Sequence, residues 1–485
     1  MFRTVRLLRL TVPLLASFVR DQRRWLVAGG PVERNAGFHA RRAARLTSVV
    51  AQLGPTFVKL SQLFAGRRDL IPSPYVDAIS TLTDQVPAIP WSEVVTALTT
   101  SYGRPPSAVF DTIDPVPLAA ASLGQVHRAT LAGREVVVKV LRPGVEQMVE
   151  ADLKLARQLL RRFGHHLPRV HGQGLAAVLD EFERRVADEM DFRTEARYAK
   201  AVRANFAKIS SVRVPEVIEG YTRQRALVLE YMEGTRIDRL DDAVTSGRLA
   251  PERILGIVIE LYVRMMLVDG LFHADPHPGN LLVDDAGRVV LLDFGMVVEV
   301  DPGTRRALVQ TVFAAITDDR RGLVEGFYAM GIVEPGAPRA VIEALADELL
   351  VTAHDQTTVQ ERLDRMSRLA DDVVGHLYNF PVRLPSDLVY FARTAALIEG
   401  LGTRYDPRFN PVSFATPIAL RFRGPILRSL GEGFVLPDTV PGAIGALAGH
   451  AAAWTRRMGQ LLGVAVRQAR GSTGQTRGAR GMLKP

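Results

Sequence analysis

The spacing of apolar and polar residues changes character along the 485-residue chain. Residues 46–104 have helical periodicity, broken at proline-rich points near positions 55, 73 and 88. Residues 122–141 then alternate around the turn Ala132-Gly133-Arg134, and their second half is a β-branched run. A strand-turn-strand hairpin is the economical interpretation of this stretch.

Beyond the hairpin, helical patterns cover residues 151–161 and 175–206, and a strand follows in RALVLEY at 225–231. Residues 280–295, NLLVDDAGRVVLLDFG, contain two apolar strands joined by an Asp-Asp-Ala-Gly turn. Nearly everything after this segment has the pattern of helices joined by proline-rich connections. The order of helices, a small sheet-rich lobe and a large helical lobe predicts an α+β fold.

The composition limits the class of protein. Apolar residues make up 47% of the chain, which is enough to bury a large core in a globular protein. The absence of cysteine excludes disulfides, thiolate nucleophiles and cysteine-ligated metal sites. It also favours a reducing compartment, so we predict a cytoplasmic location.

The net charge of +9 is concentrated at the two ends. Residues 1–45 carry ten arginines against two acids, and residues 454–485 carry seven basic residues and no acid, so the middle of the chain is net acidic. This distribution argues against a nucleic-acid cleft through the main body and favours attraction to an anionic membrane surface. Solvated arginine-rich ends are the alternative.

The N-terminal segment has the pattern of a basic interfacial helix kinked at Pro13. Arg6, Arg9 and Arg20 lie opposite an apolar face formed by Val5, Leu8, Val12, Leu15 and Val19. Packing of this face on the protein's own core is an equal alternative. Both this segment and the apolar stretch 443–454 are too short to span a bilayer, and residues 471–485 have the composition of a disordered tail.

The segment LFHADPHPGNLL at 271–282 carries the candidate chemistry. Asp275 and Asn280 lie five positions apart, and the strand pair that follows ends at Asp293 in the triplet Asp-Phe-Gly. Phosphoryl transfer needs oxygen ligands for a metal ion and a carboxylate near the acceptor oxygen. We therefore predict that Asp275 acts near the transferred group and that Asn280 and Asp293 hold Mg²⁺.

A kinase-like site also needs a lysine on a strand that binds phosphates and a helix carboxylate that fixes this lysine. Lys139 ends a nearly continuous apolar run, where an unpaired ammonium group would be costly, so a partner is expected. We predict that this partner is Glu195. Gly124 is the single glycine of the preceding loop, so the sequence contains neither a GxGxxG nor a Walker-type loop there.

Two further patterns narrow the mechanism. His273-Ala274-Asp275 has no arginine before the aspartate, and no APE-like motif follows the Asp-Phe-Gly triplet, so regulation by a phosphorylated activation loop is not expected. We interpret His277 as a loop histidine and not as a zinc ligand, and we interpret the group His165, His166 and His171 in the same way.

Together these motifs make the chain similar to the UbiB/AarF family of atypical kinase-like proteins over residues 53–410. The family has an alanine-rich loop in place of the glycine-rich one, and a KxGQ motif on an N-terminal helical extension that folds over the active site. The sequence KLSQ resembles that motif with Ser61 in place of glycine, and EMDFRTEA resembles the family's ExD element with its following glutamate. HADPHPGN, DFG and RTAALIEGLGTRYDPRFN complete the resemblance.

The resemblance implies further site residues. Ala119, Ala120, Ala121 and Ser122 correspond to the ATP-binding alanine-rich loop, and backbone atoms from Glu230 to Met232 correspond to the hinge that meets adenine. Lys59, Gln62, Glu189 and Asp191 correspond to the extension and its partners. Lys59 and Gln62 are three residues apart, so they project from one helical face.

The resemblance also implies an atypical protein kinase-like two-lobe fold. We expect a basic N-terminal segment at 1–45, a helical extension at 46–112, an N-lobe at 113–233, a helical C-lobe at 234–435 and a basic tail at 436–485.

The implied function is that of an ATP- and Mg²⁺-dependent atypical kinase or ATPase, peripheral to the membrane, that supports isoprenoid quinone or related lipid metabolism. Its expected partners are a nucleotide, an anionic membrane surface or a lipid or quinone precursor, and quinone-biosynthesis proteins. A phosphotransferase acting on a small molecule or a protein, and a nucleotide-dependent scaffold without turnover, are the alternatives.

Overall fold

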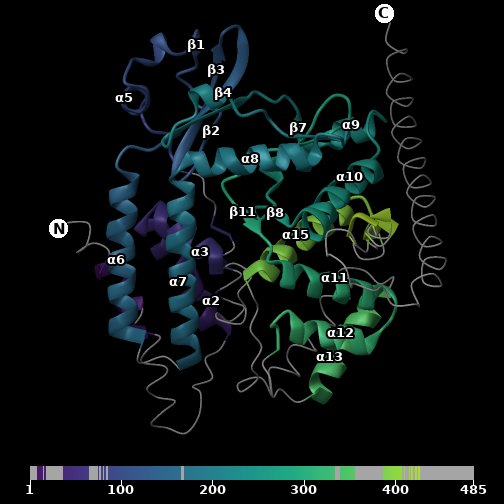
Figure 1. Ribbon diagram of the computed structural model, residues 1–485. Coiled ribbons are helices and arrows are strands. Elements are labelled where there is room, and N and C mark those ends of the chain that lie inside the picture. Colours follow the sequence, from purple (N-terminus) through teal and green to yellow (C-terminus); the bar gives the residue numbers. More distant parts are fainter. Residues whose placement is uncertain are drawn as a thin grey trace, which may run out of the picture. The chain divides into compact units, whose positions relative to one another are not determined.

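The computed structural model of the chain describes residues 8–14, 16–17, 36–64, 86–164, 169–333, 339–354 and 386–406, with short stretches between 75 and 82 and between 409 and 426 (Figure 1). The described residues divide into two units. The first runs to Ala201 and adds Pro215–Met232 and Asp293–Met296. The second comprises Val202–Val214, Glu233–Leu292 and the described residues from Val297 onward.

The first unit contains a sheet in the order β1-β3-β4-β6, with β2 also paired to β3. The predicted hairpin is confirmed as β3 (Gly124–Leu131) and β4 (Arg134–Leu141), and β6 (Ala226–Glu230) adds to β4. The turn residues Ala132 and Gly133 both have positive φ angles, as a two-residue turn that matches the strand twist requires. The short strands β1 (Thr112–Ile113) and β2 (Ala119–Ala120) were not predicted from the sequence.

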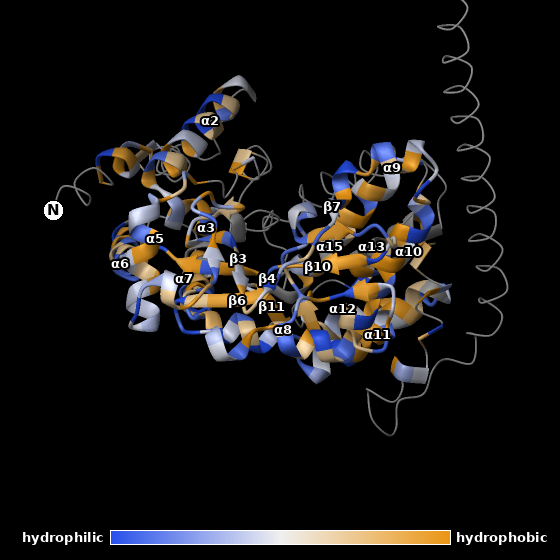
Figure 2. Cartoon of the chain, turned by 90° about the horizontal axis from the view of Figure 1, so that it is seen from above, coloured by the Kyte–Doolittle hydropathy of each residue, from blue (hydrophilic) through white to orange (hydrophobic). Residues whose placement is uncertain are grey.

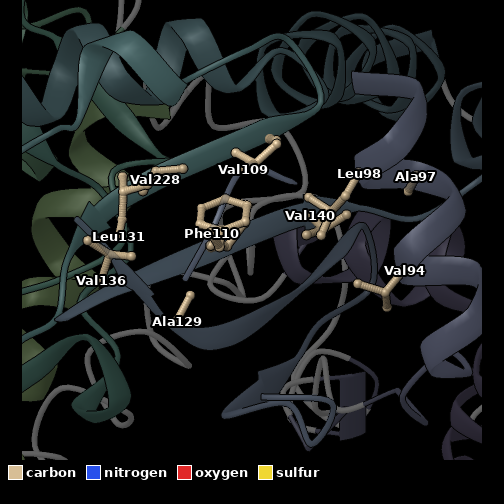
Figure 3. Close-up of a cluster of buried hydrophobic side chains, with 12 residues drawn as sticks. Val94, Ala97, Leu98, Val109, Phe110, Ala129, Leu131, Val136, Val140 and Val228 are labelled. Carbon is tan, nitrogen blue, oxygen red and sulfur yellow. The ribbon is translucent and has the colours of Figure 1, made fainter. Parts of the chain in front are cut away.

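One face of this sheet is buried under α5 (Trp91–Tyr102), as Figure 3 shows. Val136, Val138 and Val140 of β4 are fully buried in the cluster together with Val94 and Leu98 of α5. Burying each such side chain contributes about 1.5–3 kcal/mol. Because successive strand residues point to opposite faces, this burial directs Lys139 to the other side of the sheet.

The remaining helices of the first unit pack against one another (Figure 1). Helix α3 contacts α2, α6 and α7. Their bounds are α2 (Ala36–Leu53), α3 (Pro55–Phe64), α6 (Val145–Phe163) and α7 (Arg169–Glu189), and α8 (Phe192–Phe206) follows. The single helix predicted over 175–206 is wrong, because the chain leaves the helix between α7 and α8 and the Phe192 N–H donates to the Gln224 carbonyl.

The N-terminal segment is helical over residues 8–14 and 16–17. Leu14 is buried in a small core with Val49 and Leu53 of α2 and Leu155 of α6. Leu8 and Val12, which belong to the predicted apolar face, are both 37% exposed. Val5, Leu15 and Val19, the other members of that face, lie outside the described residues, so the core contact that the structure describes is that of Leu14.

The second unit contains two small sheets. Strands β5 (Val212–Arg213), β10 (Val289–Leu291), β9 (Leu281–Val283) and β7 (Thr235–Arg236) pair in that order, which confirms the predicted β9–β10 hairpin. A separate ribbon joins β8 (Leu271–His273) to β11 (Val297–Glu299). The region after the Asp-Phe-Gly triplet, where nearly everything was expected to be helical, begins with the short strand β11 and continues with helices.

The helices of the second unit are α9 (Asp241–Thr245), α10 (Pro251–Arg264), α11 (Pro302–Ile316), α12 (Arg320–Ala329), α13 (Arg339–His354) and α15 (Ser386–Thr403). Apolar residues gather on α10 and β10 in this unit and on α7 and β6 in the first (Figure 2). In the part of the chain that the structure describes, no helix has both the length and the apolar composition needed to span a membrane. The stretch 443–454 and the tail 471–485 lie outside that part.

Candidate active site

Lys139 lies at the centre of a charged cluster in the first unit. Its Nζ atom is 2.8 and 2.9 Å from the two carboxylate oxygens of Glu195 and 3.3 Å from Oδ1 of Asp293. The Phe192 ring lies beside it, with its centroid 5.5 Å from Nζ. The Lys139–Glu195 pair predicted from the sequence is present, and the contact with Asp293 was not predicted.

Burial shifts the pKa values of both Glu195 and Lys139. The Glu195 side chain is 2% exposed. Burial raises its pKa to about 7, against the opposing effect of the Lys139 charge. Burial lowers the pKa of Lys139, but the charges of Asp293 and Glu195 outweigh this effect, so the lysine pKa is raised overall. Lys139 is therefore cationic at neutral pH.

Asp293 and Gly295 shape the other side of the cluster. Asp293 has a φ of 55°, and its Oδ1 accepts a hydrogen bond from the Gly295 N–H at 3.0 Å. Its side chain is 45% exposed, so a ligand can reach the carboxylate. A Cβ atom at Gly295 would lie 3.1 Å from Asp293 Oδ1 and 3.7 Å from Glu195 Oε2, which explains why glycine suits this position.

A second lysine–glutamate pair joins the N-terminal helices to α7. Lys59 of α3 places Nζ 2.7 Å from Oε2 of Glu189, the last residue of α7. Burial raises the pKa of Glu189, while the Lys59 charge opposes the shift. Ser61 is buried and donates to the Val58 carbonyl within the same helix. The side chain of Gln62 lies outside the described part.

Asp191 takes a local role at the break between α7 and α8. Its carboxylate accepts from the Arg193 backbone N–H at 3.0 Å and forms an ion pair with the Arg193 guanidinium. Hydrogen bonding to Arg193 lowers the pKa of Asp191. The structure thus brings Lys59 to Glu189 and Lys139 to Glu195, whereas Asp191 is held by its own neighbour.

The alanine-rich loop closes on itself through backbone hydrogen bonds. The Leu118 N–H donates to Val126 at 2.7 Å and the Ala121 N–H donates to Gly124 at 2.9 Å. Ala119 and Ala121 are exposed, whereas Ser122 is 1% exposed. A Cβ at Gly124 would lie 2.7 Å from the Val140 carbonyl oxygen, so the single glycine of the loop permits a close approach to β4.

The predicted hinge residues follow β6. The Glu230 N–H donates to the Glu216 carbonyl at 2.9 Å, and its carboxylate accepts from the Glu216 N–H at 3.1 Å. The Tyr231 N–H donates to the Glu135 carbonyl at 3.2 Å, and Met232 is buried. The chain passes here from the first unit to the second.

The loop 274–280 lies in the second unit. Asn280 Nδ2 donates to the Asp275 carboxylate at 3.0 Å and to its carbonyl at 3.2 Å. The His277 N–H donates to the Asp275 carbonyl at 2.7 Å, and the Leu292 N–H donates to the Asn280 carbonyl at 2.8 Å. The structure therefore brings Asp275 and Asn280 into direct contact.

His273, at the end of β8, and His277, in the loop, both bond to backbone groups. His273 is fully buried and its Nε2 donates to the Leu292 carbonyl at 3.2 Å. His277 Nδ1 accepts from the Gly279 N–H at 3.0 Å. His165 and His166, and the side chain of His171, lie outside the described part.

The oxygen donors fit the chemistry of Mg²⁺. Asn280 uses Nδ2 toward Asp275, which leaves its Oδ1 as the atom able to coordinate a cation, and the Asp293 carboxylate is accessible. No group of three or more His, Cys, Asp or Glu among the described residues could form a metal cage. The Asn280 Oδ1 atom in the second unit and the Asp293 carboxylate in the first unit are each the kind of oxygen donor that Mg²⁺ prefers.

Sequence reasoning also missed two residues of the second unit and one of the first. Tyr262 is buried, and the Asp275 charge adds to the burial effect that raises its pKa. Arg142 donates hydrogen bonds to carbonyls of two separate loops. Asp269 ends a π-helix, Met265–Asp269, that extends α10. The position of Arg142 directly after the Lys139 strand is the one signal that the sequence offered.

The fold and these residues define a protein kinase-like chain. The chain belongs to the family of the ABC1 atypical kinase-like domain, whose model matches residues 81–327. This result confirms the UbiB/AarF resemblance and the kinase-like α+β fold.

Several relatives support the assignment. An uncharacterized protein of Synechocystis sp. is 34% identical over 84% of this chain and 70% of its own length. Protein ACTIVITY OF BC1 COMPLEX KINASE 8, chloroplastic, of Arabidopsis thaliana is 30% identical to this chain. The match covers 81% of this chain and 56% of that protein. The solved Rv3197–erythromycin complex of Mycobacterium tuberculosis matches in fold with a TM-score of 0.51 and 24% identity, covering 76% of this chain and 92% of that one.

Proposed function

We propose that this protein is an ATP-binding, Mg²⁺-dependent atypical kinase or ATPase of the UbiB/AarF type. The observation that supports this most directly is the Lys139 cluster, in which a strand lysine contacts a buried helix glutamate and the aspartate of the Asp-Phe-Gly triplet. A lysine held in this way presents a fixed positive charge to nucleotide phosphates.

Each site residue has a role in this proposal. Lys139, fixed by Glu195, binds phosphate oxygens. Asn280 and Asp293 hold Mg²⁺, which when bound neutralises phosphate charge. Asp275 places its carboxylate near the transferred phosphoryl group, and Asn280 fixes that carboxylate through the 3.0 Å hydrogen bond. The alanine-rich loop covers the phosphates, and backbone atoms from Glu230 to Met232 bind adenine.

The Lys59–Glu189 pair favours a restricted reaction. It brings α3 of the N-terminal extension to the end of α7, a few residues from Glu195, so the extension belongs to the nucleotide-binding unit. An extension held there would occupy space that a peptide substrate needs. We therefore propose a lipid or other small acceptor, or hydrolysis of ATP itself.

Membrane association is the second part of the proposal. Leu8 and Val12 are exposed one helical turn apart, Arg9 is exposed beside them, and Leu14 anchors the same helix in the core. An anchored helix with exposed apolar and basic residues suits an anionic membrane surface at the cytoplasmic side. A role in isoprenoid quinone or related lipid metabolism, with proteins of that pathway as partners, rests on the family resemblance alone.

The test is ATP turnover by the purified full chain with Mg²⁺, with and without anionic liposomes. Asp293→Asn removes a proposed metal ligand, and Asp285→Asn, at an exposed position in the β9–β10 turn, is the matched control. We expect turnover that rises with liposomes, disappears in Asp293→Asn and persists in Asp285→Asn.

Other outcomes would redirect the proposal. Phosphorylation of an added acceptor would favour the phosphotransferase. Nucleotide binding without hydrolysis under all conditions would contradict the ATPase and leave the scaffold. Equal turnover in Asp293→Asn and the unchanged chain would contradict the assigned site.

A further inference from the structure

Arg142 joins two segments of the first unit that are distant in sequence. Its Nε donates to the Ala121 carbonyl at 2.9 Å, and its Nη2 donates to the Pro87 carbonyl at 2.9 Å. Its backbone N–H donates to the Leu123 carbonyl, also at 2.9 Å. One side chain therefore fixes both the alanine-rich loop and the segment 86–90.

The segment 86–90 has a second attachment. The Ile89 N–H donates to Oε1 of Gln125 at 2.9 Å, and Gln125 is 1% exposed. Gln125 Nε2 donates in turn to Nε2 of His127 at 2.8 Å, and His127 Nδ1 donates to the Asp114 carbonyl at 2.7 Å. Burial lowers the pKa of His127, as expected for a neutral ring that accepts at one nitrogen and donates at the other.

The segment 86–90 connects two parts of the first unit. Residues 86–90 lead from the N-terminal extension, which holds Lys59, into α5, which packs on the sheet. Any change in the extension that pulls on the segment acts on Arg142 and Gln125. These two residues lie on either side of the alanine-rich loop, because Gln125 is paired with Ala120 and Arg142 holds Ala121.

We propose that Arg142 is a positioning residue that sets the conformation of the alanine-rich loop and couples it to the segment 86–90. The proposal rests on the proposed nucleotide site and adds a means of regulating it. Release of the segment loosens the loop, and nucleotide then dissociates faster. The coupling requires the guanidinium group, because its Nε and Nη2 atoms are each 2.9 Å from a carbonyl oxygen of a different segment. The single ammonium group of a lysine cannot donate to both carbonyls in this geometry.

The experiment compares the full-length protein with Arg142→Ala and Arg142→Lys. Two quantities are measured: the affinity for a fluorescent ATP analogue with Mg²⁺, and hydrogen exchange of the backbone amides in 86–90 and 118–124. Lys154→Ala is the control, because Lys154 lies in α6 of the same unit, is 70% exposed and pairs only with Glu150 among the ion pairs of the described residues. Thermal unfolding checks that each variant is folded.

We expect both Arg142 variants to exchange faster in both segments and to bind the nucleotide about fivefold more weakly or worse, the lower end of typical couplings between sites. Lys154→Ala should change neither quantity. Because lysine keeps the charge, full recovery in Arg142→Lys would mean that Arg142 acts by charge on the phosphates and would overturn the proposal.

A second variant tests the route of the coupling. Gln125→Met keeps the side-chain length but removes the hydrogen bonds to Ile89 and to His127, and it does not change Arg142. We expect faster exchange in 86–90 and also in 118–124. Faster exchange in 86–90 alone would overturn the coupling.

The outcome also separates the two proposals. If the unchanged protein binds no nucleotide, the proposed function fails, while the exchange data still decide whether Arg142 joins the two segments. If nucleotide binds and the Arg142 variants match the unchanged protein in affinity and exchange, the coupling fails and the proposed function stands.

Discussion

Two lysine–glutamate pairs of the first unit have nearly the same length but different surroundings. Lys139 and Glu195 are 2.8 Å apart, and Lys59 and Glu189 are 2.7 Å apart. Glu195 is 2% exposed and its lysine also contacts Asp293, whereas Glu189 is 14% exposed and its lysine comes from the N-terminal extension. The first pair joins a strand to a helix within the first unit, and the second attaches the N-terminal extension to the same unit.

The two pairs share an excess of negative charge. Glu189, Glu195 and Asp293 provide three carboxylates for the two ammonium groups of Lys59 and Lys139. This excess of negative charge contributes to the raised pKa values of both glutamates and of Lys139. In the proposed function, this excess favours a divalent cation, the buried pair binds the ligand and the more exposed pair controls access.

The largest effect is expected from breaking the Lys139–Glu195 pair, which we call the inner pair. Lys139→Met leaves the Glu195 carboxylate buried without its cation, which should cost roughly 3–5 kcal/mol of folding stability and abolish nucleotide binding. Urea unfolding and nucleotide titration measure the two effects. The control Lys154→Met removes an ion pair that is 70% exposed at the lysine and should cost less than about 0.5 kcal/mol. Retained nucleotide binding in Lys139→Met would contradict the assigned role.

A smaller effect is expected from crowding the inner pair without removing a charge. Gly295→Ala places a methyl group 3.1 Å from Asp293 Oδ1, so the aspartate must shift, at a cost of about 1–3 kcal/mol and with weaker nucleotide binding. Gly256→Ala in α10 is the control, because nothing lies within 4 Å of its Cβ. Equal nucleotide affinity in the two variants would mean that Asp293 does not need its present position.

Breaking the Lys59–Glu189 pair, the outer pair, should lower the folding stability less than breaking the inner pair does. Lys59→Ala leaves the Glu189 carboxylate partly exposed to water, which lowers the cost of its unpaired charge, so we expect a loss of about 1–2 kcal/mol. Turnover should change, because α3 is released from α7. Lys200→Ala, which removes an exposed pair with Glu219, should leave turnover unchanged. A stability loss as large as that of Lys139→Met would make the two pairs equivalent.

The smallest effect is a difference in pH dependence. The pKa of Glu189 is raised by burial, so the folded protein binds this proton more tightly than the unfolded chain does. The contribution of Glu189 to stability is therefore complete at low pH and declines as the pH rises above the ordinary glutamate value of 4.5.

Glu189→Gln removes the titrating carboxyl group. This variant is therefore the reference from which the contribution of Glu189 is measured. The unfolding free energy of the unchanged protein minus that of Glu189→Gln should fall as the pH rises, in urea titrations from pH 4 upward. A difference that rises with pH would mean that the Lys59 charge outweighs burial.

Local sequence signals identified the candidate residues well. The turn residues Ala132-Gly133-Arg134 and the alternating apolar residues around them are short-range signals, and they predicted the β3–β4 hairpin. The spacing of Asp275 and Asn280 predicted that they act together, and the hydrogen bond between them is closed by their own short loop. The ribbon of β8 and β11 escaped prediction, because each strand has three residues and too little pattern to reveal a strand.

The sequence by itself determined which groups are available: a lysine at the end of an apolar strand, carboxylates on helices, and oxygen donors around a short hairpin. Only the tertiary structure decided their partners. Glu195 was predicted as the partner of Lys139, but the contact of Lys139 with Asp293 across 154 positions and that of Arg142 with Pro87 across 55 were not. Such contacts depend on how the helices pack on the sheet, because hydrogen bonds and ion pairs act over a few ångströms, and distance along the chain says nothing about distance in space.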